Sequence, residues 1–251
     1  MAQILTIHSF RGGTGKSNTT ANIAGILASN GHRVGVVDTD IQSPGIHTLF
    51  GIDPDDIEHS LNDYLWGKCA VEETAVDVTA SLGTGVAGSV FLIPSSLRVG
   101  DISRALRDGY DVGVLHEGLF ALVNALGLDY LMIDTHPGLN EETLLSMGIS
   151  HSVAIIMRPD QQDYAGTSVT VQVARRLRVP RLVIVVNKVP RTLDLADVER
   201  RVEETYGCEV AAVLPHSDEL MSLASQGVFS LLFPDHPVTA CFKQVAAKLT
   251  A

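Results

Sequence analysis

The chain has 251 residues, 45% of them hydrophobic, and a formal net charge of −11. A chain of this length and composition can bury one full core, so we expect a single α/β domain over residues 1–251. Residues 1–150 carry 7 Lys and Arg against 18 Asp and Glu, whereas residues 151–251 carry 11 of each. This acidic balance disfavours DNA as a partner, because proteins that coat nucleic acid normally present a basic face.

Four arginines run against this balance, and they lie within seven residues of one another near a predicted helix end. We favour a role in complementing the negative end of that helix over contact with a phosphate backbone. They are Arg175, Arg176, Arg178 and Arg181.

Targeting and redox signals are weak in this sequence. The longest aliphatic run covers residues 182–186, far short of the roughly 20 residues that span a bilayer, and no basic region precedes the first apolar stretch. We therefore expect a soluble, cytoplasmic protein. Cys69, Cys208 and Cys241 form no CxxC pair and no histidine-rich cluster, so we expect three buried thiols rather than disulfides or a zinc site.

Apolar runs of strand length alternate with helix-length patterns along most of the chain. This rhythm predicts a three-layer α/β fold, with a mostly parallel, twisted sheet of about seven or eight strands and helices on both faces. The predicted strands cover residues 4–9, 33–38, 90–94, 130–134, 153–158, 182–187 and 210–215. The predicted helices cover residues 17–30, 112–126, 141–148, 164–177, 195–206, 218–226 and 238–249.

Two regions need a separate interpretation. Residues 51–89 fit the alternation of strands and helices worst, with an acidic stretch and a glycine-rich piece, and we expect a surface segment there.

In the last helix, one apolar stripe is formed by Val238, Phe242, Val245 and Leu249. We favour packing of this stripe against the sheet over contact with a membrane.

A glycine-rich loop joins the first predicted strand to the first helix. Its glycines let backbone N–H groups turn toward phosphate oxygens, Lys16 supplies a point charge, and Ser17 offers a hydroxyl to Mg²⁺. The usual form of this loop has glycine where this chain has Phe10, and here the basic Arg11 precedes the glycine pair. The full segment reads Phe10-Arg11-Gly12-Gly13-Thr14-Gly15-Lys16-Ser17.

Carboxylates follow two of the predicted strands. The second strand ends in Asp38-Thr39-Asp40, and the fourth ends at Asp134, which a Pro-Gly turn follows. Ligands of open parallel sheets bind beyond the carboxyl ends of the strands, so these side chains reach the site that the glycine loop makes. An aspartate at such a strand end holds the water shell of Mg²⁺ in nucleotide hydrolases.

Together these residues resemble the deviant P-loop ATPases of the ParA/MinD family, a group that also contains nitrogenase iron protein and metal-insertion ATPases. The resemblance covers nearly the whole chain. It implies ATP and Mg²⁺ as cofactors and an ATP-dependent sandwich homodimer. The matching pieces are residues 11–17, Asp38-Thr39-Asp40 with Pro44-Gly45, residues 134–138, Asn187-Lys188, and Leu214-Pro215 followed by Ala224 and Gly227.

The resemblance also assigns roles by position. Lys16 would neutralise the phosphates, Asp40 would orient the attacking water, and Ser17 would bind Mg²⁺ directly. Asp134 would hold the metal through water, with Asp38 supporting the metal and the first switch loop. The residues implied to hold the nucleotide are Gly12, Gly13, Thr14, Gly15, Lys16, Ser17 and Asn18, with Asn187 and Pro215 facing the adenine.

The chain departs from the family at Arg11, where a lysine usually reaches the partner's nucleotide. Arginine keeps the charge, and its planar fork binds phosphate oxygens at two points, so we expect cross-subunit catalysis to be retained. Two histidines, His8 and His136, are interpreted as non-catalytic, because Asp40 is available as the group that activates water.

Three functions are consistent with these residues. The leading one is a slow, partner-stimulated ATPase switch that positions or partitions a cargo or division component, acting with a protein activator or cargo adaptor. The second is an ATPase for metallocentre maturation, which the absence of cysteine between Cys69 and Cys208 disfavours. The third is a nucleotide-regulated binding module with little hydrolysis, which phosphate release distinguishes from the first.

Overall fold

The computed structural model describes residues 2–251, which are built around one twisted eight-stranded sheet. The strand order is β3-β4-β2-β5-β1-β6-β7-β8, and every neighbouring pair is parallel except β3 and β4. Parallel order requires crossover helices, which explains the alternation in the sequence. The strands are β1 (Gln3–His8), β2 (Arg33–Asp38), β3 (Val76–Asp77), β4 (Ser89–Ile93), β5 (Tyr130–Asp134), β6 (Ser152–Met157), β7 (Arg181–Val189) and β8 (Glu209–Pro215).

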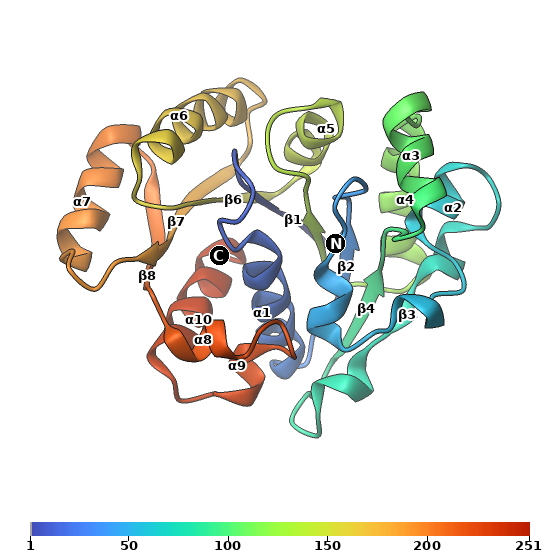
Figure 1. Ribbon diagram of the computed structural model, residues 1–251, viewed down its shortest axis with the longest axis horizontal. Coiled ribbons are helices and arrows are strands. Elements are labelled where there is room, and N and C mark those ends of the chain that lie inside the picture. Colours follow the sequence, from blue (N-terminus) through green and yellow to red (C-terminus); the bar gives the residue numbers. More distant parts are fainter. Residues whose placement is uncertain (1) are drawn as a thin grey trace.

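Helices cover both faces of the sheet, as Figure 1 shows. One face carries α1 (Lys16–Ser29), α9 (Phe229–Leu232) and α10 (Pro237–Leu249), and their apolar side chains share one core with β1, β2 and β4. The other face carries α4 (Val112–Ala125), α5 (Glu141–Ile149), α6 (Gln161–Arg176) and α7 (Leu195–Tyr206). The predicted three-layer α/β architecture is confirmed.

All seven predicted strands are present, two with the predicted ends and five with ends that differ by one or two residues. The sequence interpretation missed β3 and three helices, α2 (Leu61–Leu65), α3 (Val99–Asp108) and α9. It also extended the helix predicted at 218–226 too far, because α8 covers only Asp218–Ser222. The chain then turns through Ala224 and Ser225, whose φ angles of 49° and 64° are left-handed and incompatible with a continuing helix.

The expectation that residues 51–89 form a surface segment is wrong in part. The acidic stretch 53–58 is exposed apart from Ile57, but Leu61, Leu65 and Val71 are buried in the core beneath α4. Leu61 and Leu65 lie in the five-residue helix α2, and Val71 begins a 3-10 turn, so each element is too short to show a period in the sequence. The three side chains share this core with Leu115, Leu119 and Leu122 of α4.

Other sequence predictions have definite outcomes. The stripe on α10 is confirmed as core, since its four residues are at most 1% exposed.

The three cysteines are free thiols but only half-buried, which corrects the expectation of full burial. Arg175 donates from Nη2 to the carbonyl oxygens of Tyr206 (2.5 Å) and Gly207 (2.9 Å), so it caps the end of α7 rather than that of its own helix. Within residues 2–251, no helix combines the length and apolarity that crossing a bilayer requires.

Candidate functional site

The loop between β1 and α1 has a backbone that only glycine adopts easily. Gly13 and Gly15 have φ angles of 76° and 96°, and Gly15 is the residue before the first turn of α1. A Cβ added to Gly15 would lie 2.4 Å from Nδ2 of Asn187. The loop therefore packs tightly against the end of β7, with the N-terminus of α1 directed at the space above it.

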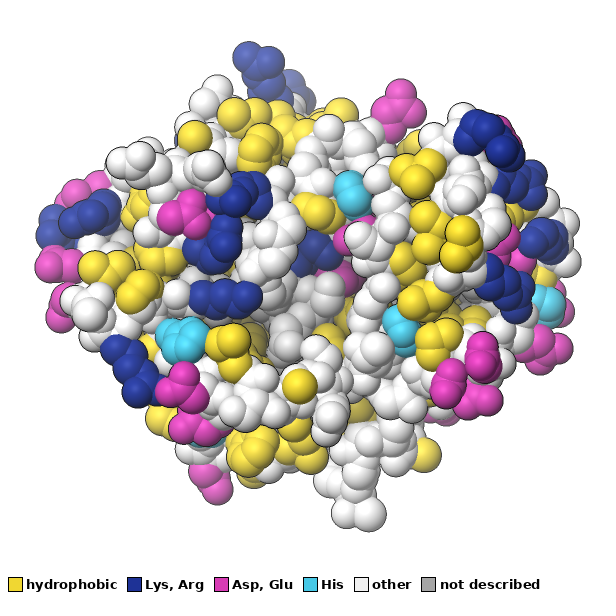
Figure 2. Space-filling model, viewed as in Figure 1, with side chains coloured by type: hydrophobic (Ala, Val, Ile, Leu, Met, Phe, Trp, Pro, Cys, Tyr) yellow, Lys and Arg dark blue, Asp and Glu magenta, His cyan; other side chains and the backbone are white. Residues whose placement is uncertain are grey.

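That space is a pocket of about 300 Å³ at the carboxyl edge of the sheet. Figure 2 shows basic, acidic and histidine side chains together near the centre of this face. Every residue from Gly12 to Asn18 lines this pocket, and their role in holding a nucleotide stays a prediction. The other lining residues are Ser9, Asp40, Gly45, Leu49, Pro137, Lys188 and Ser225.

Lys16 and Asp134 form a buried ion pair at the base of the site. Nζ of Lys16 donates to Oδ1 of Asp134 at 3.0 Å, and Oγ1 of Thr20 donates to the same oxygen at 3.2 Å. Burial opposes the charge on Lys16, but the Asp134 carboxylate outweighs it and raises the lysine pKa. Oδ2 of Asp134 is buried and has no hydrogen-bond partner in residues 2–251.

Asp38 organises the loop that follows β2. Its Oδ1 accepts from the backbone N–H of Asp40 at 3.0 Å, and its Oδ2 accepts from that of Gly45 at 3.3 Å. Asp38 is also the register neighbour of Asp134 across the β2–β5 pair. Burial, and then the Asp134 charge, raise the pKa of Asp38 to about 8. Asp38 therefore binds two backbone N–H groups of the loop that carries Asp40, and its predicted support of a metal stays a prediction.

This group of carboxylates fits Mg²⁺. A buried acceptor without a partner, Oδ2 of Asp134, is a group that a metal-bound water would satisfy, and carboxylate oxygens are hard ligands. Within the described residues 2–251, no three acidic, histidine or cysteine side chains form a ready cage. Mg²⁺ is normally bound by several waters and by substrate phosphate oxygens, so it needs few direct protein ligands. One serine hydroxyl, with carboxylates that act through water, is therefore a suitable site. Ser17, the predicted direct ligand, lies half-buried in the pocket wall.

Arg11 does not line the pocket and is held within its own chain. Its Nη1 lies 3.2 Å from Oδ1 of Asp163 and 3.5 Å from Oδ1 of Asp160, at the start of α6. Arg158 shares both carboxylates. The Arg11 side chain is still 37% exposed, at the rim of the loop.

Asn187 lies behind the phosphate loop rather than in the pocket. Its Nδ2 donates to the carbonyl oxygen of Thr14 at 2.8 Å, and its Oδ1 accepts from the backbone N–H of Lys188 at 2.8 Å. One N–H of Nδ2 and one lone pair of Oδ1 are therefore used to hold the loop. Pro215 ends β8, half-buried and outside the pocket lining.

Sequence analysis named Lys188 only as part of the Asn187-Lys188 pair at the end of β7 and gave it no role of its own. Its Nζ donates to the carbonyl oxygen of Gly13 at 2.8 Å, and its own φ of 57° is left-handed. A lysine directly after a buried strand was the available signal. It adds a second cation to the phosphate pocket.

His136 was also given no role, and the structure places it against Asp40. Nδ1 of His136 lies 2.7 Å from Oδ1 of Asp40, and this hydrogen bond raises the pKa of the histidine. His8, by contrast, is buried beneath the site, where Nδ1 pairs with Oγ1 of Thr135 at 2.7 Å. Burial and the nearby Lys16 lower the pKa of His8 to about 3, so it is a neutral core residue.

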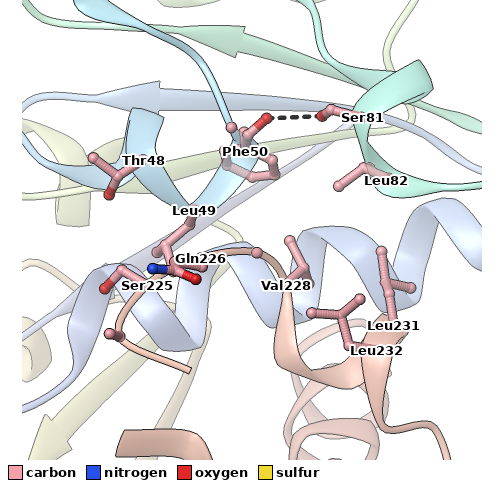
Figure 3. Close-up of a pocket in the computed structure, with 13 residues that line it drawn as sticks. Thr48, Leu49, Phe50, Ser81, Leu82, Ser225, Gln226, Val228, Leu231 and Leu232 are labelled. Atoms are coloured by element: carbon pink, nitrogen blue, oxygen red, sulfur yellow. Dashed lines mark hydrogen bonds between the residues drawn. The ribbon is translucent and has the colours of Figure 1, made fainter. Parts of the chain in front are cut away.

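A second cavity of about 580 Å³ adjoins the phosphate pocket and shares Leu49 and Ser225 with it. Figure 3 shows its largely apolar wall, in which Oγ of Ser81 donates to the carbonyl oxygen of Phe50 at 2.8 Å. This bond joins the turn after the first switch loop (Ile46–Phe50) to the turn at Thr79–Leu82.

Comparison with known proteins agrees with this geometry. The model of the AAA domain family matches residues 2–180. An uncharacterised ATP-binding protein of Methanocaldococcus jannaschii is 26% identical over 250 residues, covering 99% of this chain and 88% of that protein. An iron-sulfur cluster carrier protein of Pyrococcus furiosus is 24% identical over 257 residues, covering 98% of this chain and 84% of that protein.

Among solved structures, the septum site-determining protein MinD of Pyrococcus horikoshii, complexed with Mg-ADP, superposes with a TM-score of 0.78. The sequences are 21% identical, and the match covers 98% of this chain and 95% of MinD. The family match spans most of the chain, and the superposition extends the shared fold to nearly all of it. The chain therefore belongs to the AAA domain family and has the phosphate loop and fold of the ParA/MinD-type P-loop ATPases.

Proposed function

We propose that this protein is an ATPase switch that binds Mg²⁺ and ATP, dimerises face to face with ATP bound, and separates after hydrolysis. The observation that carries the proposal is the convergence of Lys16, Asp38, Asp40 and Asp134 on the glycine loop, at the carboxyl edge of three adjacent strands. A cationic loop beside acidic strand ends suits a polyanion bound together with a divalent cation.

Each residue has a definite task in this proposal. The N–H groups of the loop and the N-terminus of α1 bind the phosphates, and Lys16 moves its charge from Asp134 toward them. Ser17 would bind Mg²⁺ directly, and Asp134 would bind it through water. The metal would then draw negative charge from the phosphate oxygens. Asp40 lines the pocket and orients the attacking water, while Asp38 keeps the loop that carries Asp40 in place.

Arg11 supplies the link between two subunits in this proposal. Its guanidinium sits exposed at the rim of the loop and is held only by charged partners of its own chain. Asp163 is buried, but Arg158 also pairs with it, so this carboxylate keeps a charged partner when Arg11 turns to the phosphates of a facing subunit. Assembly of the site from two chains makes turnover slow in the isolated protein and responsive to a partner.

The decisive experiment measures mass by light scattering, with saturating ATP and Mg²⁺. Asp40→Ala, which binds ATP but hydrolyses it poorly, is expected to run as a dimer with ATP and as a monomer with ADP. Lys16→Ala should remain monomeric in both, and Asp55→Ala, an exposed carboxylate on a surface turn, should behave as the parent. An Asp40→Ala protein that stays monomeric with bound ATP would contradict the proposed dimer.

The role of Arg11 has its own matched control. Arg191 is also an exposed arginine, paired with Asp218 of the same chain at 2.6 Å, but it lies outside the phosphate pocket. Arg11→Ala is expected to lose both ATP-dependent dimerisation and hydrolysis, whereas Arg191→Ala should keep both. If the Arg11→Ala protein hydrolyses and dimerises like the parent, the cross-subunit role is wrong.

The positioning of a cargo or division component belongs to the same proposal. The ATP-locked Asp40→Ala dimer is the state that a protein activator or cargo adaptor would recognise, so it is the appropriate bait for capture from the native cell. Release of phosphate, measured with and without the captured partner, separates a working ATPase from a binding module with little hydrolysis. The acidic total charge predicts weak or absent binding to nonspecific duplex DNA.

A second candidate is an ATPase for metallocentre maturation, favoured by the likeness to iron-sulfur cluster carrier proteins. The three cysteines lie on separate elements: Cys69 after α2, Cys208 before β8, and Cys241 in α10. Iron and labile sulfide measured in anaerobically purified protein discriminate the two. A stoichiometric cluster would favour the carrier function over the positioning switch.

A further inference from the structure

The loop after β2 that carries Asp40, called the first switch loop, is joined by a side-chain contact to the loop at residues 134–138 that carries His136, called the second switch loop. Asp40 lies two residues beyond the end of β2, and His136 lies two residues beyond the end of β5. Asp38 and Asp134 are register partners in these strands, so equal steps along the two chains bring Asp40 and His136 side by side. Their side chains meet with Nδ1 of His136 2.7 Å from Oδ1 of Asp40.

The contact fixes one oxygen of the Asp40 carboxylate. Oδ1 also accepts from the backbone N–H of Ser43 at 3.2 Å, so it has two donors. No hydrogen bond within residues 2–251 uses Oδ2 of Asp40, and Asp40 lines the phosphate pocket. A carboxylate held at one oxygen has one orientation, and its other oxygen is available to a water molecule.

A second bond braces the same junction. Oγ1 of Thr39 donates to a carboxylate oxygen of Glu142, which lies in the first turn of α5. Two neighbouring residues of the first switch loop are thereby attached: Thr39 to α5, and Asp40 to the second switch loop. The backbone is held through Thr39, and the carboxylate of Asp40 is held through His136.

We propose that His136 is a positioning residue for ATP hydrolysis, which acts by holding Asp40 in the orientation that directs the attacking water. The inference rests on the proposed function of Asp40. His136 itself does not line the phosphate pocket, so it acts through Asp40 and not on the nucleotide. Misplacing a reacting group by about 1 Å costs up to about 100-fold in rate, so loss of this bond should act on kcat.

The test compares two substitutions at residue 136. His136→Ala removes the donor, whereas His136→Asn keeps an N–H at nearly the same reach as Nδ1. We expect kcat for ATP to fall about 10- to 100-fold in His136→Ala and to return to within about 3-fold of the parent in His136→Asn. KM and the affinity for a fluorescent ADP analogue should change less than about 3-fold in both, since the phosphate loop is untouched. His116→Ala, on α4, is the control for loss of a histidine elsewhere.

A double-mutant cycle places the effect on Asp40. In an Asp40→Ala background, His136→Ala should cause no further loss of kcat, because the group it positions is gone. The inference is overturned if His136→Ala has the parent's kcat, if His136→Asn is as slow as His136→Ala, or if the two substitutions add fully.

Failure of the proposed function gives a different pattern. A parent protein that hydrolyses ATP no faster than Lys16→Ala would remove the ATPase and, with it, the role of His136. A parent that hydrolyses ATP, together with an inactive Asp40→Ala and a fully active His136→Ala, would leave the ATPase intact and remove only the inference about His136.

Discussion

Glu142 offers a test of the electrostatics around the second switch. The residue lies in the first turn of α5, is 2% exposed, and has one carboxylate oxygen without a partner in the described residues 2–251. Burial raises its pKa to about 7, although the hydrogen bond from Thr39 and the charge of His136 act in the other direction. Glu142→Gln keeps the shape and an acceptor for Thr39 but removes the ionisation.

The sign follows from the direction of this shift. A group whose pKa is higher in the folded than in the unfolded protein contributes stability below its unfolded pKa and loses that contribution as the pH rises through the folded value. Moving from the usual 4.5 to about 7 corresponds to about 3 kcal/mol. The parent should therefore lose about 3 kcal/mol relative to Glu142→Gln between pH 4.5 and pH 8.

Urea unfolding of both proteins at half-unit pH intervals measures this difference directly. The gap in unfolding free energy should grow through the interval and stay constant above about pH 8. Glu141→Gln, at the exposed neighbouring position, is the control for replacing a glutamate in the same helical turn. A Glu142→Gln gap that varies by less than about 0.5 kcal/mol across the interval would refute the assignment of a buried, proton-binding carboxyl.

The remaining predictions concern the fold. A Cβ at Gly88 would lie 2.1 Å from the carbonyl oxygen of His32, whereas one at Gly85 meets nothing within 4 Å. Thermal unfolding should therefore show that Gly88→Ala lowers the free energy of unfolding by at least about 2 kcal/mol. Gly85→Ala should change it by no more than about 1 kcal/mol. Phe242 is 1% exposed and Phe233 is 42% exposed, so chemical unfolding should give a loss of about 3–5 kcal/mol for Phe242→Ala and about 1 kcal/mol or less for Phe233→Ala. Equal losses within either pair would contradict the packing described above.

The layered fold was predictable because its signals are local. Strands covered on both faces are continuously apolar, as in residues 182–186, and segments of helix length lie between them. Among the segments that sequence reasoning misjudged, α2 has only five residues, too few to show a period. Leu61, Leu65 and Val71 are buried because they cover one region of the sheet, which their spacing along the chain does not reveal.

The site divides in the same way. The sequence by itself determined the phosphate loop and the strand-end carboxylates, because the glycine requirement and the edge of a parallel sheet are consequences of backbone geometry. Only the tertiary structure decided the partners of these residues: Arg11 with Asp163, Asn187 with the phosphate loop, and His136 with Asp40. These partners are about 100 residues or more apart in the chain, and they meet because strand order and register, which no local pattern encodes, bring the strand ends to one edge.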